Sequence, residues 1–385
     1  MLNFTFHNPT RIHFGEGQIK SIAKEVPANA KVLITYGGGS IKKNGVYDQV
    51  VDALKDHTSF EFSGIEPNPN YDTLVKALDI IKEHKIDYLL AVGGGSVVDG
   101  TKFIAAAAMY EGDDPWDIVA KQAKITQALP IGAVLTLPAT GSETNTGAVV
   151  TRNGNKLPFG NPLVRPLFAV LDPAVTLTLS DRQISNGVVD AFVHTMEQYL
   201  TYSVDGKVQD RISEGLLLTL IEEGPKALSD ANKTNLDVRA NIMWSATLAL
   251  NGLIGAGVPQ DWATHMIGHE LTGGYGIDHA RTLSIVLPAV MKVCKEAKSE
   301  KLLQYADRVW GIREGDQNQR INEAIALTEA FFKKMDVPVR LSDVGLGEAD
   351  IDDIIVKLEE HGMVKLGENR DVTPDVSRNI LRAAL

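Results

Sequence analysis

Residues 88–99 read YLLAVGGGSVVD, a short apolar stretch that passes through three glycines and a serine into a helical pattern. The same arrangement occurs earlier, because residues 31–40 read KVLITYGGGS. A strand that ends in glycines before a helix leaves backbone N–H groups open to an anion, because no side chain blocks the approach. Both stretches therefore predict phosphate-binding turns. A tight turn without a ligand is the alternative for either alone, since neither completes the G-x-G-x-x-G pattern.

Strands and helices alternate through the first half of the chain. Apolar runs typical of strands occupy 31–36, 86–92, 131–138 and 166–171, and helical patterns occupy 43–55, 71–84 and 97–110. Such alternation predicts βαβ units and a parallel sheet, with ligands at the carboxyl ends of the strands. From about residue 183 onward, long amphipathic segments at helical period replace this pattern. We therefore expect an α/β domain over 1–182 and an all-helical domain over 183–385.

Composition excludes several classes of protein. The chain has 385 residues and a formal net charge of −11, which argues against a nucleic-acid partner. Its single cysteine, Cys294, rules out an internal disulfide framework and fits a reducing compartment. The N-terminus has no apolar signal-peptide core, and no uncharged apolar run approaches membrane-spanning length. We expect a cytoplasmic protein without a membrane partner.

A third polar turn follows the run at 131–138. The segment from Thr136 to Glu143, TLPATGSE, offers the hydroxyl groups of Thr136, Thr140 and Ser142 beside a glycine. Three glycine- or hydroxyl-rich turns at the strand ends of one sheet indicate a single extended ligand that carries phosphate, and a dinucleotide has the right size. Ordinary polar loops on an α/β fold are the alternative.

Acidic and histidine side chains gather in the second half. Asp190 and His194 are four residues apart on one expected helix, so they share a face. His265, His269 and His279 follow within one short segment. Asp and His are suitable ligands for zinc or iron. Spacing alone favours the pairs Asp190/His194 and His265/His269 and leaves His279 open, although single histidines on such helices are more often packed or surface residues.

The motifs VGGGSVVDGTK, TLPATGSE and NGVVDAFVHTMEQY, with the histidine segment, resemble the iron-activated (group III) alcohol dehydrogenases along the whole chain. The similarity is greatest to the NADPH-dependent aldehyde reductases and butanol dehydrogenases of that family. The resemblance implies an α/β dinucleotide-binding domain followed by an all-α metal-binding domain, as in dehydroquinate synthase. It also implies that Asp190, His194, His265 and His279 bind one divalent metal, Zn²⁺ or Fe²⁺, per chain. His269 then becomes a candidate for proton relay or substrate contact.

The resemblance also divides the cofactor site. It implies that the second glycine turn binds the pyrophosphate and nearby ribose, together with the three hydroxyl residues above, and that the first lies at the adenosine end. The residues of the two turns are Gly93, Gly94, Gly95 and Ser96, and Gly37, Gly38, Gly39 and Ser40. Asp99 is expected near the nicotinamide, where it is a candidate catalytic or orienting residue. Asn68 and Lys156 are further candidates for cofactor contacts.

The first turn also indicates which cofactor is used. Members of the family that prefer NAD tend to carry an aspartate there, which repels a 2′-phosphate, whereas this chain has glycines, Ser40 and the pair Lys42-Lys43. We therefore expect NADP rather than NAD. The expected activity is hydride transfer between NADP(H) and a short- to medium-chain aldehyde or alcohol, with the metal as Lewis acid. A homodimer is expected by family analogy. The alternatives are a lyase similar to dehydroquinate synthase, which uses NAD and a metal, and a non-catalytic nucleotide or metal sensor.

Overall fold

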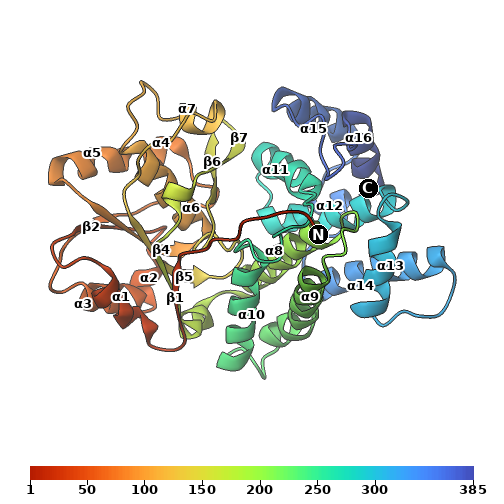
Figure 1. Cartoon of the computed structure of the whole chain (residues 1–385), viewed down its shortest axis with the longest axis horizontal. Coiled ribbons are helices and arrows are strands. Elements are labelled where there is room, and N and C mark those ends of the chain that lie inside the picture. The colour runs from red at the N-terminus through yellow and green to blue at the C-terminus, as the bar shows by residue number, and fades with distance from the viewer. The chain divides into compact units, whose positions relative to one another are not determined.

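The structure, a computed structural model, describes all residues from 1 to 385 and divides into two compact units (Figure 1). The sheet unit comprises His7–Leu179 and Thr234–Thr247. The helical unit comprises Met1–Phe6, Ser180–Lys233 and Leu248–Leu385. The main division, between Leu179 and Ser180, is close to the boundary expected at residue 182. Two short segments depart from a single boundary. Met1–Phe6 belongs to the helical unit although it begins the chain, and Thr234–Thr247 belongs to the sheet unit although it lies in the second half.

A six-stranded parallel sheet forms the core of the sheet unit, with the strand order β1-β8-β5-β4-β2-β3. Its strands are β1 (Arg11–Phe14), β2 (Lys31–Thr35), β3 (Thr58–Phe62), β4 (Tyr88–Gly94), β5 (Ile131–Leu137) and β8 (Phe168–Leu171). The four strands expected from the apolar runs are confirmed as β2, β4, β5 and β8. The sequence analysis missed β1, β3 and a separate antiparallel hairpin of β6 (Gly147–Arg152) and β7 (Asn155–Gly160).

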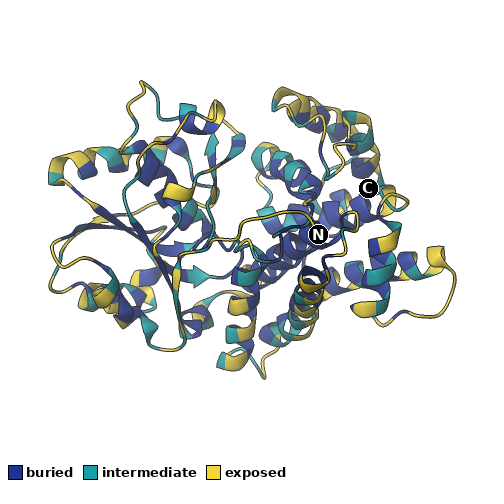
Figure 2. Ribbon diagram, viewed as in Figure 1, coloured by how far each residue is buried: buried dark blue, intermediate teal, exposed yellow.

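Helices cover both faces of this sheet, so its central strands are dark blue along their length in Figure 2. Alternate residues of β4 enter different cores: Leu89 and Ala91 pack with the core that includes Phe103, whereas Leu90 and Val92 pack on the opposite face. The helices of this unit are α1 (Ile22–Glu25), α2 (Ser40–Lys43), α3 (Val46–Ala53), α4 (Tyr71–Leu74), α5 (Lys76–His84), α6 (Gly95–Ala107) and α7 (Asp117–Ala120), with short 3₁₀ turns at Gln18–Ser21, Pro162–Val164 and Pro173–Thr178. Burial on both faces explains why these strands read as continuous apolar runs.

The two glycine turns lie at neighbouring strand ends. β2 and β4 pair directly, with Thr35 opposite Ala91. The connection from β2 leads outward to β3, whereas that from β4 leads the other way to β5, so the strand order reverses between β2 and β4. Open α/β sheets bind ligands where the strand order reverses, at the carboxyl ends. The topology therefore brings both turns to the expected ligand-binding edge.

The helical unit contains the remaining helices and no sheet. They are α8 (Asp181–Tyr199), α9 (Lys207–Leu228), α11 (Ala263–Tyr275), α12 (His279–Val293), α13 (Ser299–Arg308), α14 (Gln317–Lys334), α15 (Glu348–Glu360) and α16 (Pro374–Ala383), with a 3₁₀ turn at Leu341–Val344; α10 (Leu236–Ala249) lies mostly in the sheet unit. A capping box between Ser180 and Gln183 fixes the start of α8. None of the helices in the structure is both long and apolar enough to span a membrane.

Candidate metal centre and cofactor turns

One face of α8 organises the candidate metal centre. Arg182, Asn186, Asp190 and His194 succeed one another at intervals of four residues, and Glu197 follows three residues later. Residues at these spacings lie on the same side of a helix. The middle of this stripe is buried, with Asp190 3% and His194 4% exposed. A single rigid helix thus presents a carboxylate and an imidazole to the histidines of α11 and α12.

Three imidazole nitrogens converge on one carboxylate oxygen. The Nε2 atoms of His194, His265 and His279 lie 3.6, 3.8 and 3.8 Å from Oδ1 of Asp190. These separations are too long for good hydrogen bonds. They do suit a shared cation, because two ligands of a tetrahedral metal with bonds of about 2.1 Å are roughly 3.4 Å apart. Moreover, Nε2 of His265 is buried and has no hydrogen-bond partner. The residues present therefore fit a divalent metal.

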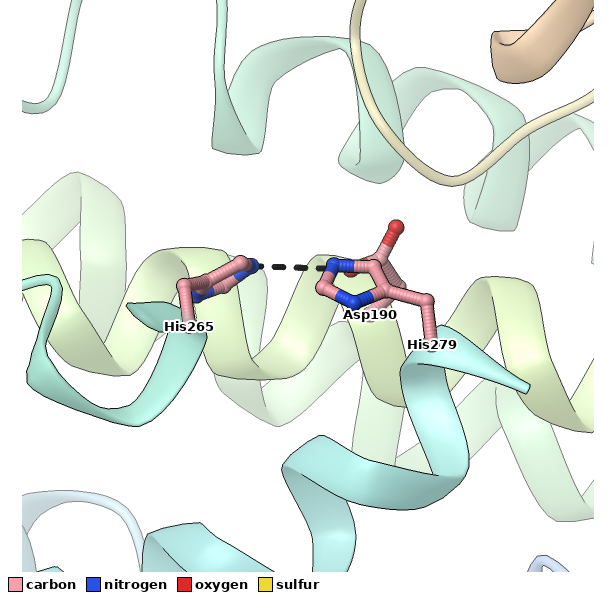
Figure 3. A group of neighbouring side chains, drawn as sticks. All are labelled: Asp190, His265 and His279. Carbon is pink, nitrogen blue, oxygen red and sulfur yellow. Dashed lines mark ion pairs between the residues drawn. The ribbon is translucent and has the colours of Figure 1, made fainter. Parts of the chain in front are cut away.

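Figure 3 shows Asp190, His265 and His279 pointing toward one another from α8, α11 and α12. One possible ligand atom from each lies within 4.8 Å of the others. His279 therefore belongs to the converging group, whereas spacing alone had paired His265 with His269 and left His279 open. The resemblance had implied the set that the structure brings together.

Glu197 holds His265 in position. Its Oε2 is hydrogen-bonded to Nδ1 of His265, and its Oε1 accepts from the backbone N–H of Thr264 at 2.7 Å. A bond at Nδ1 leaves Nε2 to face the other ligands, which is how a carboxylate usually orients a metal-binding histidine. Burial raises the pKa of Glu197. Burial opposes protonation of His265, but Glu197 and Asp190 together raise the pKa of His265 to about 9.

The start of α12 is fixed to the same stripe. Asp278 precedes His279 and accepts hydrogen bonds from Nε of Arg182 at 2.7 Å and from Nδ2 of Asn186 at 2.8 Å. Burial acts to raise the pKa of Asp278, but these two donors outweigh it and lower that pKa. The first turn of α12 is thus tied to α8 at the residue next to a candidate ligand. This contact orients His279.

His269 lies one helical turn beyond His265 on α11 and is 6% exposed. The centroid of its ring is 5.0 Å from that of His279 and 6.3 Å from that of His265. His269 therefore adjoins the converging group. That position is compatible with contact to a substrate or transfer of a proton beside the metal.

The second glycine turn opens onto the N-terminus of α6, which no side chain caps. A Cβ atom on Gly95 would lie 2.4 Å from Oγ1 of Thr140, so only glycine allows this approach of the second turn to the third. The hydroxyl of Ser96 accepts from the backbone N–H of Asn68 at 3.3 Å. The structure therefore gathers Gly93–Ser96, Asn68 and Thr140 at one edge of the sheet, beside Thr136 at the end of β5.

The side chains of Asp99 and Ser142 are hydrogen-bonded to each other. The Ser142 hydroxyl donates to Oδ1 of Asp99 at 2.6 Å, and Oδ2 of Asp99 accepts from the backbone N–H of Val149 at 2.9 Å. Ser142 is 2% exposed, and its hydroxyl is engaged by Asp99. Burial raises the pKa of Asp99, whereas nearby Lys102 and Lys156 act to lower it.

The first glycine turn has a carboxylate that the sequence analysis did not foresee. Glu61, on β3, accepts from the hydroxyl of Tyr36 at 2.6 Å, from Nζ of Lys42 at 2.7 Å and from the hydroxyl of Tyr47. Lys42 is therefore paired with a carboxylate beside the first turn. Gly39 has a φ of 89°, which favours glycine at this turn.

Sequence reasoning missed Glu197, Asp278, Glu61 and Lys102 as contributors to these sites. Glu197 could have been found, because it continues the D-x-x-x-H spacing by three residues on the same helix face. Asp278 could have been suspected from its place before His279. Glu61 carried no such signal, because it reaches the first turn only through the pairing of β3 with β2.

A buried carboxylate with three imidazoles in one unit, and a parallel sheet with glycine turns in the other, together indicate a metal- and dinucleotide-dependent oxidoreductase. The family model described as iron-containing alcohol dehydrogenase matches residues 9–173, and that of the C-terminal part of the Fe-containing alcohol dehydrogenase family matches residues 184–385. The chain belongs to the iron-containing alcohol dehydrogenase family. This confirms the resemblance and the expected fold class.

Known relatives match this chain over its full length. The chain is 61% identical to the NADPH-dependent aldehyde reductase YqhD of Escherichia coli, and the match covers 100% of both chains. It is 41% identical to a probable NADH-dependent butanol dehydrogenase of Bacillus subtilis, again over 100% of both. The crystal structure of E. coli YqhD superposes with a TM-score of 0.98 at 60% identity, and covers 100% of this chain and 99% of that one. That of the Thermotoga maritima NADH-dependent butanol dehydrogenase A gives 0.94 at 38%, with 100% and 99% covered.

Proposed function

We propose that the protein is a metal-dependent aldehyde reductase and alcohol dehydrogenase that transfers hydride between NADP(H) and a short- to medium-chain aldehyde or alcohol. The observation that carries the proposal is the convergence of His194, His265 and His279 on Asp190 in a chain whose relatives are named for this chemistry. A divalent metal held by these four residues would act as a Lewis acid on the oxygen of a carbonyl or alcohol. Family membership favours this activity over the lyase and sensor alternatives.

The residues of the chain then have separate tasks. Asp190 supplies the only negative charge among the four ligands, and Glu197 orients His265 through Nδ1. His269, beside His279, is placed to hold or pass the proton that the product oxygen requires. Asp99 orients the nicotinamide end of the cofactor. Burial of Asp190, His194 and His265 limits the access of bulk water, which strengthens their electrostatic effect.

NADP is the proposed cofactor, although the reason differs from the one given by the sequence. Relatives named for NADPH and for NADH both match this chain, so family membership does not decide the question. The relative with 61% identity is named for NADPH. At the first turn, Gly38 and Ser40 are exposed and Lys43 is an exposed cation, whereas Lys42 is held by Glu61. Backbone N–H groups, the Ser40 hydroxyl and Lys43 suit a 2′-phosphate.

We further propose a cytoplasmic homodimer. Four residues of the N-terminal segment, Met1, Leu2, Phe4 and Phe6, are large, apolar and 46–52% exposed, which a second copy could cover. Sedimentation equilibrium of the purified protein would test this, since a mass of one chain, 41.7 kDa, would contradict it.

A panel of aldehydes and alcohols, assayed with NADPH and NADH before and after removal of the metal, tests the main proposal. We expect aldehyde reduction with NADPH, loss of that activity on chelation, and recovery when Zn²⁺ or Fe²⁺ is restored. The proposed activity would be contradicted if the metal-loaded protein reduced no aldehyde of about two to eight carbons.

A further inference from the structure

Lys102, on α6, is a fully buried cation in the sheet unit, with 0% of its surface exposed. Its Nζ donates to Oγ of Ser142 at 2.8 Å, to Oδ1 of Asn145 at 3.0 Å and to the backbone carbonyl of Gly147 at 2.7 Å. A buried ammonium is costly unless its protons find acceptors, and here all three do. The three acceptors come from one segment, residues 142–147, so Lys102 fixes this segment against α6.

These contacts set the direction of a hydrogen-bond chain. An ammonium group can only donate, so Oγ of Ser142 must accept from Lys102. The single hydroxyl proton of Ser142 is then directed to Oδ1 of Asp99, 2.6 Å away. Because Val149 N–H binds the second oxygen of Asp99, both oxygens of this carboxylate are held in fixed positions. The order Lys102, Ser142, Asp99 therefore runs from the buried cation to the candidate nicotinamide contact.

The charges around this chain act together. Burial lowers the pKa of Lys102 to about 8, while Asp99 and Glu143 favour its charged form and Arg165 opposes it. Asp99 itself faces Lys102 on its own helix, the Ser142 hydroxyl, the Val149 N–H on β6, and Lys156 on β7. All four stabilise the carboxylate against the effect of burial. Removal of Lys102 would take away a charge and the fixed direction of the Ser142 hydroxyl at once.

We propose that Lys102 is a positioning residue of the cofactor site, whose ammonium directs the Ser142 hydroxyl and so holds Asp99 and the 142–147 segment in place before the nicotinamide cofactor binds. The inference rests on the proposed function only in taking these turns as the cofactor site. It goes beyond it by assigning a role to a residue that touches neither cofactor nor substrate. A merely structural lysine would affect the stability of the fold and leave the NADPH affinity of a folded variant unchanged.

The test is the dissociation constant of NADPH, measured by its fluorescence as a function of pH, for the full chain and for Lys102→Met. This substitution keeps the length of the side chain and removes its donors. We expect binding at pH 7 to weaken about tenfold or more, because Asp99 and the 142–147 segment must then be ordered when the cofactor binds. The weakening of NADPH binding at low pH, the acid limb of the profile, should begin about one pH unit higher, because Asp99 loses its main cationic neighbour. Metal content should not change.

Lys121→Met is the matched control, because Lys121 is an exposed lysine of the same unit that pairs only with Asp117 four residues away. It should leave both readouts at their original values. A folded Lys102→Met protein with unaltered affinity and an unmoved acid limb would overturn the inference. If the original protein binds NADPH and reduces no aldehyde, the proposed function fails while this comparison of binding stays valid.

Ser142→Ala provides a second route if Lys102→Met does not fold. It interrupts the same chain at its middle and leaves Lys102 with Asn145 and Gly147 as acceptors. The acid limb should again move to higher pH. In the double variant the affinity should fall no further than in Lys102→Met alone, within about twofold, because both changes break one chain. Fully additive losses, or an acid limb unmoved in Ser142→Ala, would contradict the proposal.

Discussion

The imidazole ring of His194 stacks on that of His265, with their centroids 4.5 Å apart and their planes 19° from parallel. The stack holds both Nε2 atoms at similar distances from Oδ1 of Asp190, 3.6 and 3.8 Å. α8 supplies His194 and α11 supplies His265, so the two helices are aligned at this point by ring contact. A cation bound beside Asp190 would meet both nitrogens without rearrangement of either ring.

Asp190→Asn should release the metal. The substitution barely changes the shape of the side chain but removes the only anionic ligand, while three imidazoles remain. We expect the purified parent protein to hold one equivalent of mostly Zn²⁺ or Fe²⁺, with zinc favoured after aerobic handling by its higher affinity for such ligands. Elemental analysis should find far less metal in the variant, and aldehyde turnover should be abolished. NADPH affinity should be nearly unchanged, and full turnover without metal would refute the Lewis-acid mechanism.

His269→Ala should separate catalysis from metal binding. Because His269 adjoins the converging group and is proposed to act on the substrate, the variant should keep its metal at full stoichiometry and lose turnover, by about 10²-fold or more if it transfers a proton. His265→Ala is the comparison, since it removes a converging nitrogen and should lose metal. Equal metal loss in the two variants would return His269 to the ligand set.

Glu197→Gln should weaken the metal without removing a ligand. Gln can still accept at one atom, but it no longer holds Nδ1 of His265 with a negative charge. Loss of such a carboxylate partner typically lowers metal affinity 10–100-fold (roughly). Competition with a chromophoric chelator measures the dissociation constant of the metal. Asp205→Asn is the control, because it makes the same change of carboxylate to amide in an exposed ion pair with Lys207. An unchanged dissociation constant would show that Glu197 is not needed to orient His265.

Gly38→Asp should reverse or erase the preference for NADPH. A Cβ atom at Gly38 meets nothing within 4 Å, so the aspartate fits, and its charge would oppose a 2′-phosphate. The measurement is kcat/KM with NADPH and with NADH. Equal use of both cofactors by the unmodified protein would show that this turn does not discriminate between them.

Lys298→Met should destabilise the helical unit. Lys298 is 5% exposed, and its Nζ lies 2.9 Å from Asp261 and 2.8 Å from Glu368, both of which are buried. Burial opposes the charged form, but the two carboxylates raise the pKa of Lys298. Removal of the lysine leaves two buried carboxylates without their cation, at a cost of about 3–5 kcal/mol in the free energy of unfolding. Denaturant titration measures it, with Lys207→Met as the exposed control; a difference below about 1 kcal/mol would contradict this role.

The central strands were predictable because burial on both faces forces apolar residues at every position. β3 reads TSFEF and is largely exposed, so it lacks that pattern and was missed. The β6–β7 hairpin did carry a signal that was overlooked. Its turn contains Asn153 and Gly154, both with positive φ, and Asn-Gly between two strand-forming stretches is typical of a tight hairpin.

The site was predictable where its residues share one helix and not where they meet through tertiary contact. Asp190 and His194 are four residues apart, so their common face follows from the helical period alone. His279 begins a different helix, and only packing brings it to Asp190. Likewise, the bond between Ser142 and Asp99 joins two turns, and no pattern within either of them predicts it.

The chain crosses between its two units more than once, since Met1–Phe6 belongs with the helices and Thr234–Thr247 with the sheet. A single cut near residue 180 would therefore separate each of these segments from the unit to which it belongs. Genetic recombination at that point would transfer residues 7–179 without the 234–247 segment, and so without most of α10, which belongs to the same unit. A chimera meant to exchange cofactor preference among relatives should instead graft the individual turns, or carry the 234–247 segment along with residues 7–179.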